Sequence, residues 1–232
     1  MRHFRSYLSV AAVALAFAFP AAAETVEVVP GVQVTKRSYS APINEQPFFG
    51  FTTKTAEQKA EDEKFVAAII GATGTREKAF EEITKRAWIA IQGGKVREAA
   101  VRFNQAFLVS PTESSIFHGF AVIAQARFND YEAADELFKI ALKQPHPVKA
   151  LKADYGRLLL MAKRPRDAQK ILDQAVKESP DLSDAWTNLA WARFQNGDPA
   201  AACAAAEEAT RKRPSNNSIS DLTAVLKVAQ CK

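Results

Sequence analysis

The sequence predicts an all-α protein, a solenoid of repeated helix–turn–helix units, and two observations carry this prediction. First, alanines and prolines recur at an interval of 34 residues, which indicates an internal repeat. The recurring positions are Ala134, Ala168 and Ala202; Ala141, Ala175 and Ala209; Pro180 and Pro214; and, with a slip of one residue, Ala99, Ala106 and Pro111. Second, from Thr55 onward apolar residues follow a helical spacing, and no stretch alternates as a strand would.

The last repeated unit shows the clearest pattern of residue types. It has Trp186, then Leu189 followed by the small Ala190, a turn at Gly197 and the closing Pro214. Earlier units keep parts of this pattern, namely Tyr155, Gly156, Leu172 and Pro180; Tyr131, Phe138, Pro145 and Pro147; and Ala87, Gly94, Phe103 and Pro111. The pattern resembles the tetratricopeptide repeat, in four units over residues 80–214. The resemblance implies a right-handed superhelix whose concave inner face binds a protein or peptide.

Packing explains why these residue types recur. Small residues such as Gly156 and Ala190 let the paired helix come close, and Ala168 and Ala202 are expected to meet them there. Larger side chains such as Phe103 are expected to fill the space between units. Each closing proline lacks an N–H group and biases the preceding residue out of the helical region, so it ends the second helix.

Residues 1–23 have the pattern of a secretory signal peptide. Arg2 and Arg5 precede an apolar run, and small residues ending at Ala23 form a cleavage site before Glu24. The run is shorter than the roughly 20 residues that a membrane-spanning helix needs. The sequence therefore predicts export to the periplasm, with secretion as the alternative, and no membrane insertion of the mature chain.

Residues 24–54 are predicted to be an extended or disordered N-terminal arm, because prolines interrupt them and they show no helical period. A short β-hairpin around Pro30 and Gly31 is the alternative. The apolar cluster Phe48, Phe49 and Phe51 is expected to dock on the first helices, with partner recognition as a second interpretation.

Residues 55–79 are predicted to be an N-terminal capping helix and turn. Thr55 and Gln58 have the spacing of a capping box at its start.

Residues 215–232 are predicted to be a C-terminal capping helix, opened by a capping box of Ser218 and Asp221. Its apolar stripe consists of Leu222, Val225, Leu226 and Ala229.

The two cysteines of the chain, Cys203 and Cys231, are predicted to form a disulfide. At 1.5 Å per residue, Cys203 lies about 15 Å before the end of its helix and Cys231 about 20 Å along an antiparallel closing helix. An oxidising compartment favours such a bond.

The sequence shows no motif for catalysis, for a metal or for a cofactor. His118 is expected to be a hydrogen-bonded core residue, and His146 to be exposed in a turn. The net charge is +5, but the sequence has no extended basic block with interleaved aromatic residues, so nucleic acid is not an expected partner. The mildly basic surface either is simply solvated or favours acidic partners. We expect no enzyme.

The candidate site is therefore the groove that the first helices of the four units line. The inward positions are Lys85, Trp88 and Gln92; Ile123 and Arg127; Arg157 and Met161; and Asn188, Trp191 and Gln195. Trp88 and Trp191 either bind the partner or pack between units, and two Trp with two Arg on one surface are typical of a binding hot spot. By the resemblance, Asn188 matches an Asn that some members use to hold a peptide carboxylate, although the basic partners of that Asn are missing.

Two functions fit this interpretation. One is a scaffold or adaptor that binds a protein or peptide, for example in cell-envelope assembly. The other is a holding chaperone for extended segments. Because one fold supports many functions, the sequence does not name the partner.

Overall fold

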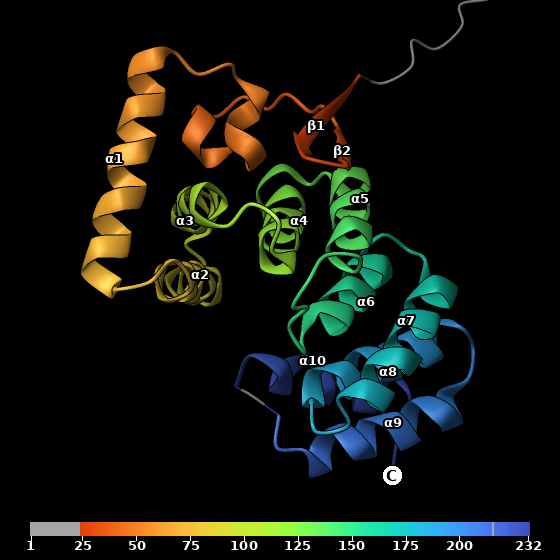
Figure 1. The fold of residues 1–232 in the computed structure, drawn as a ribbon. Helices are drawn as coiled ribbons and strands as arrows, with labels where there is room; N and C mark the ends of the chain where they lie inside the picture. The colour runs from red at the N-terminus through yellow and green to blue at the C-terminus, as the bar shows by residue number, and fades with distance from the viewer. Residues whose placement is uncertain (1–23, 215) are drawn as a thin grey trace, which may run out of the picture.

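Eight helices of the computed structural model form four consecutive pairs that stack into a solenoid (Figure 1). The structure describes residues 24–214 and 216–232. The pairs are α2 (Arg76–Gln92) with α3 (Val96–Val109), α4 (Ser114–Phe128) with α5 (Tyr131–Ala141), α6 (Leu151–Met161) with α7 (Pro165–Glu178), and α8 (Ser183–Gln195) with α9 (Pro199–Arg211). Two further helices, α1 (Ala56–Thr73) and α10 (Asn216–Val228), flank the stack at opposite ends. The predicted all-α repeat solenoid is confirmed.

Side chains at several helix starts accept hydrogen bonds from N–H groups that have no partner within the helix. Thr55 Oγ1 accepts from the Gln58 N–H, and Gln58 Oε1 accepts from the Thr55 N–H, so the predicted capping box is present. Thr75 caps α2, as Asp130 caps α5 and Asp198 caps α9. These short polar residues fix where each helix begins.

Two helical glycines allow neighbouring helices to approach closely. A Cβ atom on Gly119 would lie 2.3 Å from Cε1 of Phe103, and one on Gly156 would lie 2.4 Å from Cγ of Leu172. Phe103 and Leu172 are fully buried. These small residues therefore let the neighbouring helices come close, as predicted. The atoms nearest to Gly156, however, belong to Leu172 and not to Ala168.

One hydrogen bond recurs in the second and fourth units. Ser114 Oγ donates to the carbonyl oxygen of Ala141 at 2.8 Å, and Ser183 Oγ donates to that of Ala209 at 2.9 Å. Each bond joins the start of the unit's first helix to the end of its second helix. The repeat in sequence is thus also a repeat in polar contacts.

The N-terminal arm, residues 24–54, is ordered, so the expectation of disorder is wrong and the hairpin alternative holds. Strands β1 (Thr25–Val29) and β2 (Val32–Thr35) pair antiparallel around Gly31, which has a φ of 79°. Val29 and Val34 are buried in the core. The Thr35 N–H donates to Oε1 of Glu136 on α5 at 2.7 Å. Contacts with a helix distant in sequence therefore order the arm.

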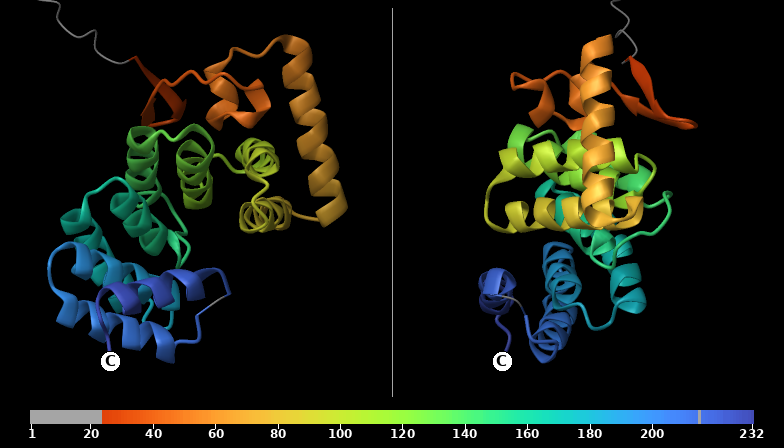
Figure 2. Two further views of the ribbon diagram at one scale, coloured as in Figure 1. Left: turned by 180° about the vertical axis from the view of Figure 1, so that it is seen from behind. Right: turned by 60° about the vertical axis from the view of Figure 1, so that its left-hand side comes forward.

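The arm continues over α3 and α4 through two 3₁₀ helices, η1 (Ile43–Glu45) and η2 (Pro47–Phe51). Phe48 is buried, with its ring centroid 4.7 Å from that of Phe120 and 5.4 Å from that of Phe107. The expected docking of the apolar cluster on the first helices is confirmed for this side chain. Figure 2 shows the arm over α3 to α5, at the opposite end of the solenoid from α10.

Polar side chains of α3 and α4 also hold the arm. Buried Asn104 accepts a hydrogen bond from the Phe49 N–H at 3.0 Å and donates to the carbonyl oxygens of Asn44 (3.0 Å) and Gln46 (2.7 Å). Glu45 forms ion pairs with both Arg97 and Arg127. The hydrogen bond from Arg97, followed by the charge of Arg127, holds the pKa of the Glu45 carboxyl below its usual range, although burial opposes this.

The two flanking helices differ in how they meet the stack. Helix α1 buries none of its residues completely and packs beside α2 through the half-buried side chains of Phe65, Val66, Ile69 and Ile70. Helix α10 instead buries most of its predicted apolar stripe, because Leu222, Val225 and Ala229 are all buried. It begins at Asn216, so Ser218 lies inside the helix and the predicted capping box of Ser218 and Asp221 is wrong.

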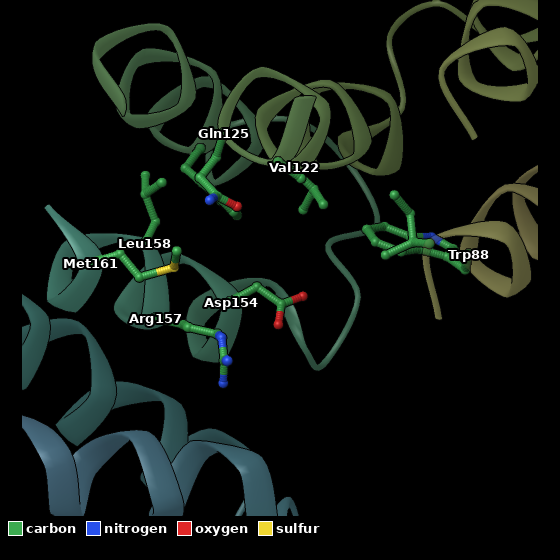
Figure 3. Close-up of a pocket in the computed structure, with 10 residues that line it drawn as sticks. Trp88, Val122, Gln125, Asp154, Arg157, Leu158 and Met161 are labelled. Atoms are coloured by element: carbon green, nitrogen blue, oxygen red, sulfur yellow. The ribbon is translucent and has the colours of Figure 1, made fainter. Parts of the chain in front are cut away.

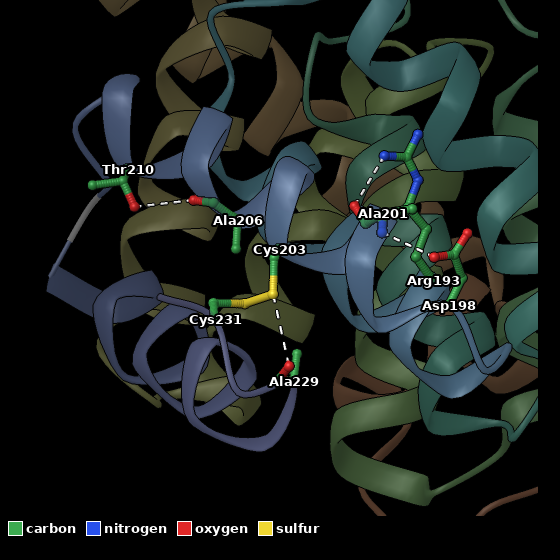
Figure 4. Close-up of a disulfide and its surroundings, with 8 residues drawn as sticks. All are labelled: Arg193, Asp198, Ala201, Cys203, Ala206, Thr210, Ala229 and Cys231. Atoms are coloured by element: carbon green, nitrogen blue, oxygen red, sulfur yellow. Dashed lines mark hydrogen bonds between the residues drawn. A yellow bond between two sulfur atoms is a disulfide. The ribbon is translucent and has the colours of Figure 1, made fainter.

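The structure pairs Cys203 of α9 with Cys231 after α10, as the helix geometry predicts (Figure 4). Their Cα atoms are 5.3 Å apart, and the bond closes a chain separation of 28 residues. It fixes α10 to the last unit.

The predicted signal peptide, residues 1–23, lies outside the described residues. Within the part of the chain that the structure describes, no helix combines the length and apolar character needed to span a membrane.

Candidate binding groove

Three adjoining cavities lie along the first helices of the repeat units, and Arg157 lines all three. We call them the apolar cavity, the acidic recess and the Trp191 cavity. Their volumes are about 290, 170 and 310 Å³, respectively. Because neighbouring cavities share side chains, they form one groove from α2 to α8, with α10 along its far end.

The apolar cavity lies at the junction of α2, α4 and α6 (Figure 3). Its apolar lining is Trp88, Ile91, Val122, Ala126, Phe138, Leu158 and Met161. Trp88 packs between units, with its ring centroid 5.1 Å from that of Phe103 and 4.6 Å from that of His118. Met161 remains 45% exposed. The cavity therefore offers apolar area to a side chain that enters from solvent.

Three carboxylates and one guanidinium line the acidic recess. Asp154 comes from α6, Asp184 from α8 and Asp221 from α10. Arg157 forms an ion pair with Asp221, and Asp154 Oδ2 lies 2.9 Å from Nε2 of buried His118. Negative charge therefore predominates in this part of the groove.

The Trp191 cavity is lined by α6, α8 and α10. Trp191 Nε1 donates to the carbonyl oxygen of Asp221 at 3.1 Å, so this side chain holds α10 in place. Asn188 is buried, and its Nδ2 donates to the carbonyl oxygen of Ala153 at 3.1 Å. Both residues link structural elements, while Gln195 lines the cavity from α8.

Only some of the predicted groove residues line the groove in the structure. The side chains that line the groove are Trp88, Arg157, Met161, Asn188, Trp191 and Gln195. Lys85 and Gln92 are exposed on α2, but neither lines the three cavities. Ile123 is fully buried, and Arg127 binds Glu45 of the arm, so the assignment of these two to the groove is wrong. On α4, Val122 and Ala126 line the groove instead.

The physical reason is a change of period between the second and third units. Trp88 and Val122 are 34 positions apart, as are Arg157 and Trp191, but Val122 and Arg157 are 35 apart. An interval of 34 counted back from Arg157 and Met161 on α6 therefore selects Ile123 and Arg127 on α4, one position beyond Val122 and Ala126. Sequence reasoning also missed the acidic recess, because its three carboxylates come from separate helices.

The histidines are placed as expected. His118 is 1% exposed, and its Nδ1 has no hydrogen-bond partner in the described part of the chain. His146 is exposed and lies 3.1 Å from Glu113 Oε2. Among residues 24–214 and 216–232, no three His, Cys, Asp or Glu side chains converge in a way that could hold a metal ion.

Comparison with known proteins agrees with this architecture. Residues 154–217, which span α6 to α9, match the family model of the tetratricopeptide repeat. The structure is similar to that of PilF of Pseudomonas aeruginosa, with a TM-score of 0.57 and 23% identity over 67% of this chain and 71% of that one. It is also similar to PilW, a type IV pilus biogenesis factor (TM-score 0.52, 16% identity, 76% and 89% covered). TTC0263 of Thermus thermophilus gives a TM-score of 0.52 at 17% identity, with 73% and 98% covered.

The helix pairs, the family match and these structural neighbours define the chain as a tetratricopeptide-repeat protein. At these identities the neighbours show the fold alone. Among curated proteins, none is significantly similar to this sequence.

Proposed function

We propose that this chain is an exported adaptor of the cell envelope that binds an extended segment of a partner protein in its concave groove. One observation carries the proposal: three cavities adjoin along the first helices of the stack and share Arg157. An extended segment has side chains that alternate in direction along its length, so it can fill adjoining cavities in a way that a compact ligand cannot.

Two further features support export and a binding role. The signal-peptide pattern of residues 1–23 and the paired Cys203 and Cys231 both suit an oxidising compartment. Two of the three carboxylates of the groove are used in internal pairs, Asp154 with His118 and Asp221 with Arg157. We therefore assign binding rather than a reaction to this groove. PilW, with the same fold, is described as a pilus biogenesis factor, which suits a role in envelope assembly.

The test compares groove variants with a variant on the outer face. Ala126→Trp fills the apolar cavity from an exposed position, and Met161→Ala removes an apolar wall that is 45% exposed. Lys170→Ala, on an exposed position of α7 away from the three cavities, is the control. Trp191→Ala is less suitable, because it would also release α10.

Removal of a hot-spot side chain typically costs about 2 kcal/mol, or roughly thirtyfold in affinity. We expect both groove variants to lose the partner from periplasmic extract while their melting temperatures stay close to that of the wild type. If both recover the partner as the wild type does, the groove is not the binding surface.

A further inference from the structure

The charge of the groove is opposite in sign to that of the whole chain. The sequence has 31 Lys and Arg against 26 Asp and Glu. The acidic recess instead gathers Asp154, Asp184 and Asp221 around one guanidinium, that of Arg157. Since like charges oppose each other in a partly enclosed space, such an excess favours a cationic occupant.

Asp184 is the carboxylate that is free to bind this occupant. Asp221 is paired with Arg157 and Asp154 with His118, whereas Asp184 has no ion pair or hydrogen bond within the described residues. It lies in the first turn of α8. The positive end of the helix dipole stabilises a charged carboxylate at this position.

A second observation points independently to a missing ligand. Thr187, three residues beyond Asp184 on α8, also lines the recess. Thr187 is 1% exposed, and among residues 24–214 and 216–232 its Oγ1 has no hydrogen-bond partner. A buried hydroxyl without a partner is destabilising, and an N–H donor that enters the recess would supply a hydrogen bond to its oxygen.

The recess suits an organic cation better than a metal ion. Within the described ranges, the acidic side chains do not converge on one point as metal ligands must. The volume of about 170 Å³ admits an ammonium or guanidinium group with part of its alkyl chain. Such a group carries several N–H donors, which match both a carboxylate and a hydroxyl.

The neighbouring apolar cavity extends this specificity. Asp154 and Arg157 line both it and the acidic recess, so the two spaces are in contact. An extended chain advances about 3.3 Å per residue, so side chains only a few residues apart can reach adjoining cavities. The following inference rests on the proposed function. We infer that the groove recognises a partner segment with two features. One is a bulky apolar side chain that enters the apolar cavity, and the other, a few residues away, is a Lys or Arg side chain that binds Asp184 and Thr187.

The probe is a random peptide library displayed on phage and selected on the purified, disulfide-bonded protein. Selected peptides are synthesised, and their binding is measured by isothermal titration calorimetry. We expect enrichment of Lys or Arg close to a large apolar residue. Because Trp88 lines the apolar cavity, bound peptides should also change the tryptophan fluorescence.

A double-mutant cycle then isolates the contact with Asp184. One change replaces the peptide lysine with uncharged norleucine, and the other is Asp184→Asn, which keeps the shape of the side chain. We expect the lysine replacement to weaken binding to the wild type at least tenfold, or about 1.4 kcal/mol, and to have little effect in Asp184→Asn. Glu207→Gln removes one negative charge from an exposed position of α9 and should behave as the wild type does.

The outcomes separate this inference from the proposed function. Peptides that bind in the groove, as judged by loss of binding in Ala126→Trp, but show no preference for basic residues overturn the inference alone. The same holds if the cost of the lysine replacement is equal in the wild type and in Asp184→Asn. If no selected peptide is blocked by Ala126→Trp, both the inference and the proposed function fail.

Discussion

Replacement of Gly119 by alanine should destabilise the junction between the first and second units. The new Cβ would lie 2.3 Å from Phe103, and Phe103 is fully buried between Trp88 and Phe120, with ring centroids 5.1 and 6.4 Å away, respectively. Because the ring is enclosed in the core, it could move away from the new Cβ only by displacing its neighbours.

The magnitude follows from two opposing effects. Overpacking of a dense core costs about 1–3 kcal/mol. Alanine in place of a helical glycine returns about 0.5–1 kcal/mol. We expect a net loss of about 1–2 kcal/mol in the free energy of unfolding, which corresponds to a melting temperature roughly 2–8 °C lower for a chain of this size.

The matched control is the same substitution at Gly71 of α1, where a Cβ would have no neighbour within 4 Å. Gly71→Ala should raise stability by about 0.5–1 kcal/mol, because only the gain in helix propensity remains. Both variants are followed by circular dichroism during thermal and urea unfolding. A smaller side chain, Phe103→Leu, should partly rescue Gly119→Ala. If Gly119→Ala is as stable as Gly71→Ala, the close approach at this junction is refuted.

Three further predictions concern the two ends of the molecule. Reduction of the bond between Cys203 and Cys231 should lower the free energy of unfolding by about 3–4 kcal/mol, and two thiols that titrate in the unreduced, denatured protein would contradict the pairing. Asn104→Ala should release the N-terminal arm, because three backbone groups lose their hydrogen bonds at about 1–3 kcal/mol for each group left buried. Faster trypsin cleavage at Lys36 and Arg37 would report this release, and an unchanged cleavage rate would argue against it. The ion pairs of Glu45 lower its pKa from the ordinary value of 4.5, so they stabilise the folded state above that value, and this stability is lost as the pH falls through the lowered pKa. Glu45→Gln should therefore lose less stability on acidification than the wild type, as measured by urea unfolding midpoints, and an equal loss would exclude this role.

The solenoid could be predicted because the residues that define it lie close together in the sequence and recur from unit to unit. The alanine and proline intervals, the capping box at Thr55 and the glycines at helix contacts are all visible within short windows of sequence. The position of Cys231 relative to Cys203 follows from the rise of a helix, so the disulfide could also be derived.

The N-terminal arm could not be predicted in the same way, because distant residues order it. Asn104 and Arg127 follow Glu45 by 59 and 82 positions, and nothing in their local sequence marks them as anchors. A segment that contains three prolines and no helical period looks disordered when the helices on which it packs are not known.

The groove was predicted in part, for a related reason. Trp88 and Val122 keep the interval of 34, as do Arg157 and Trp191, but one extra position between Val122 and Arg157 breaks the register between α4 and α6. The acidic recess depends on α10, which is not a repeat helix, and on how α10 packs against α8. Such a juxtaposition is a property of tertiary packing and has no counterpart in the repeat pattern.

Site-specific photo-cross-linking in living cells tests the central claim, binding in the groove, most directly. A photoreactive amino acid at Met161, on the wall of both the apolar cavity and the Trp191 cavity, is compared with one at Lys170 on the outer face. We predict that Met161 cross-links to one short segment of a partner, identified by mass spectrometry, and that Ala126→Trp abolishes this product while Lys170 gives none. Equal cross-linking from the two positions, or a Met161 product that survives Ala126→Trp, would contradict binding in the groove.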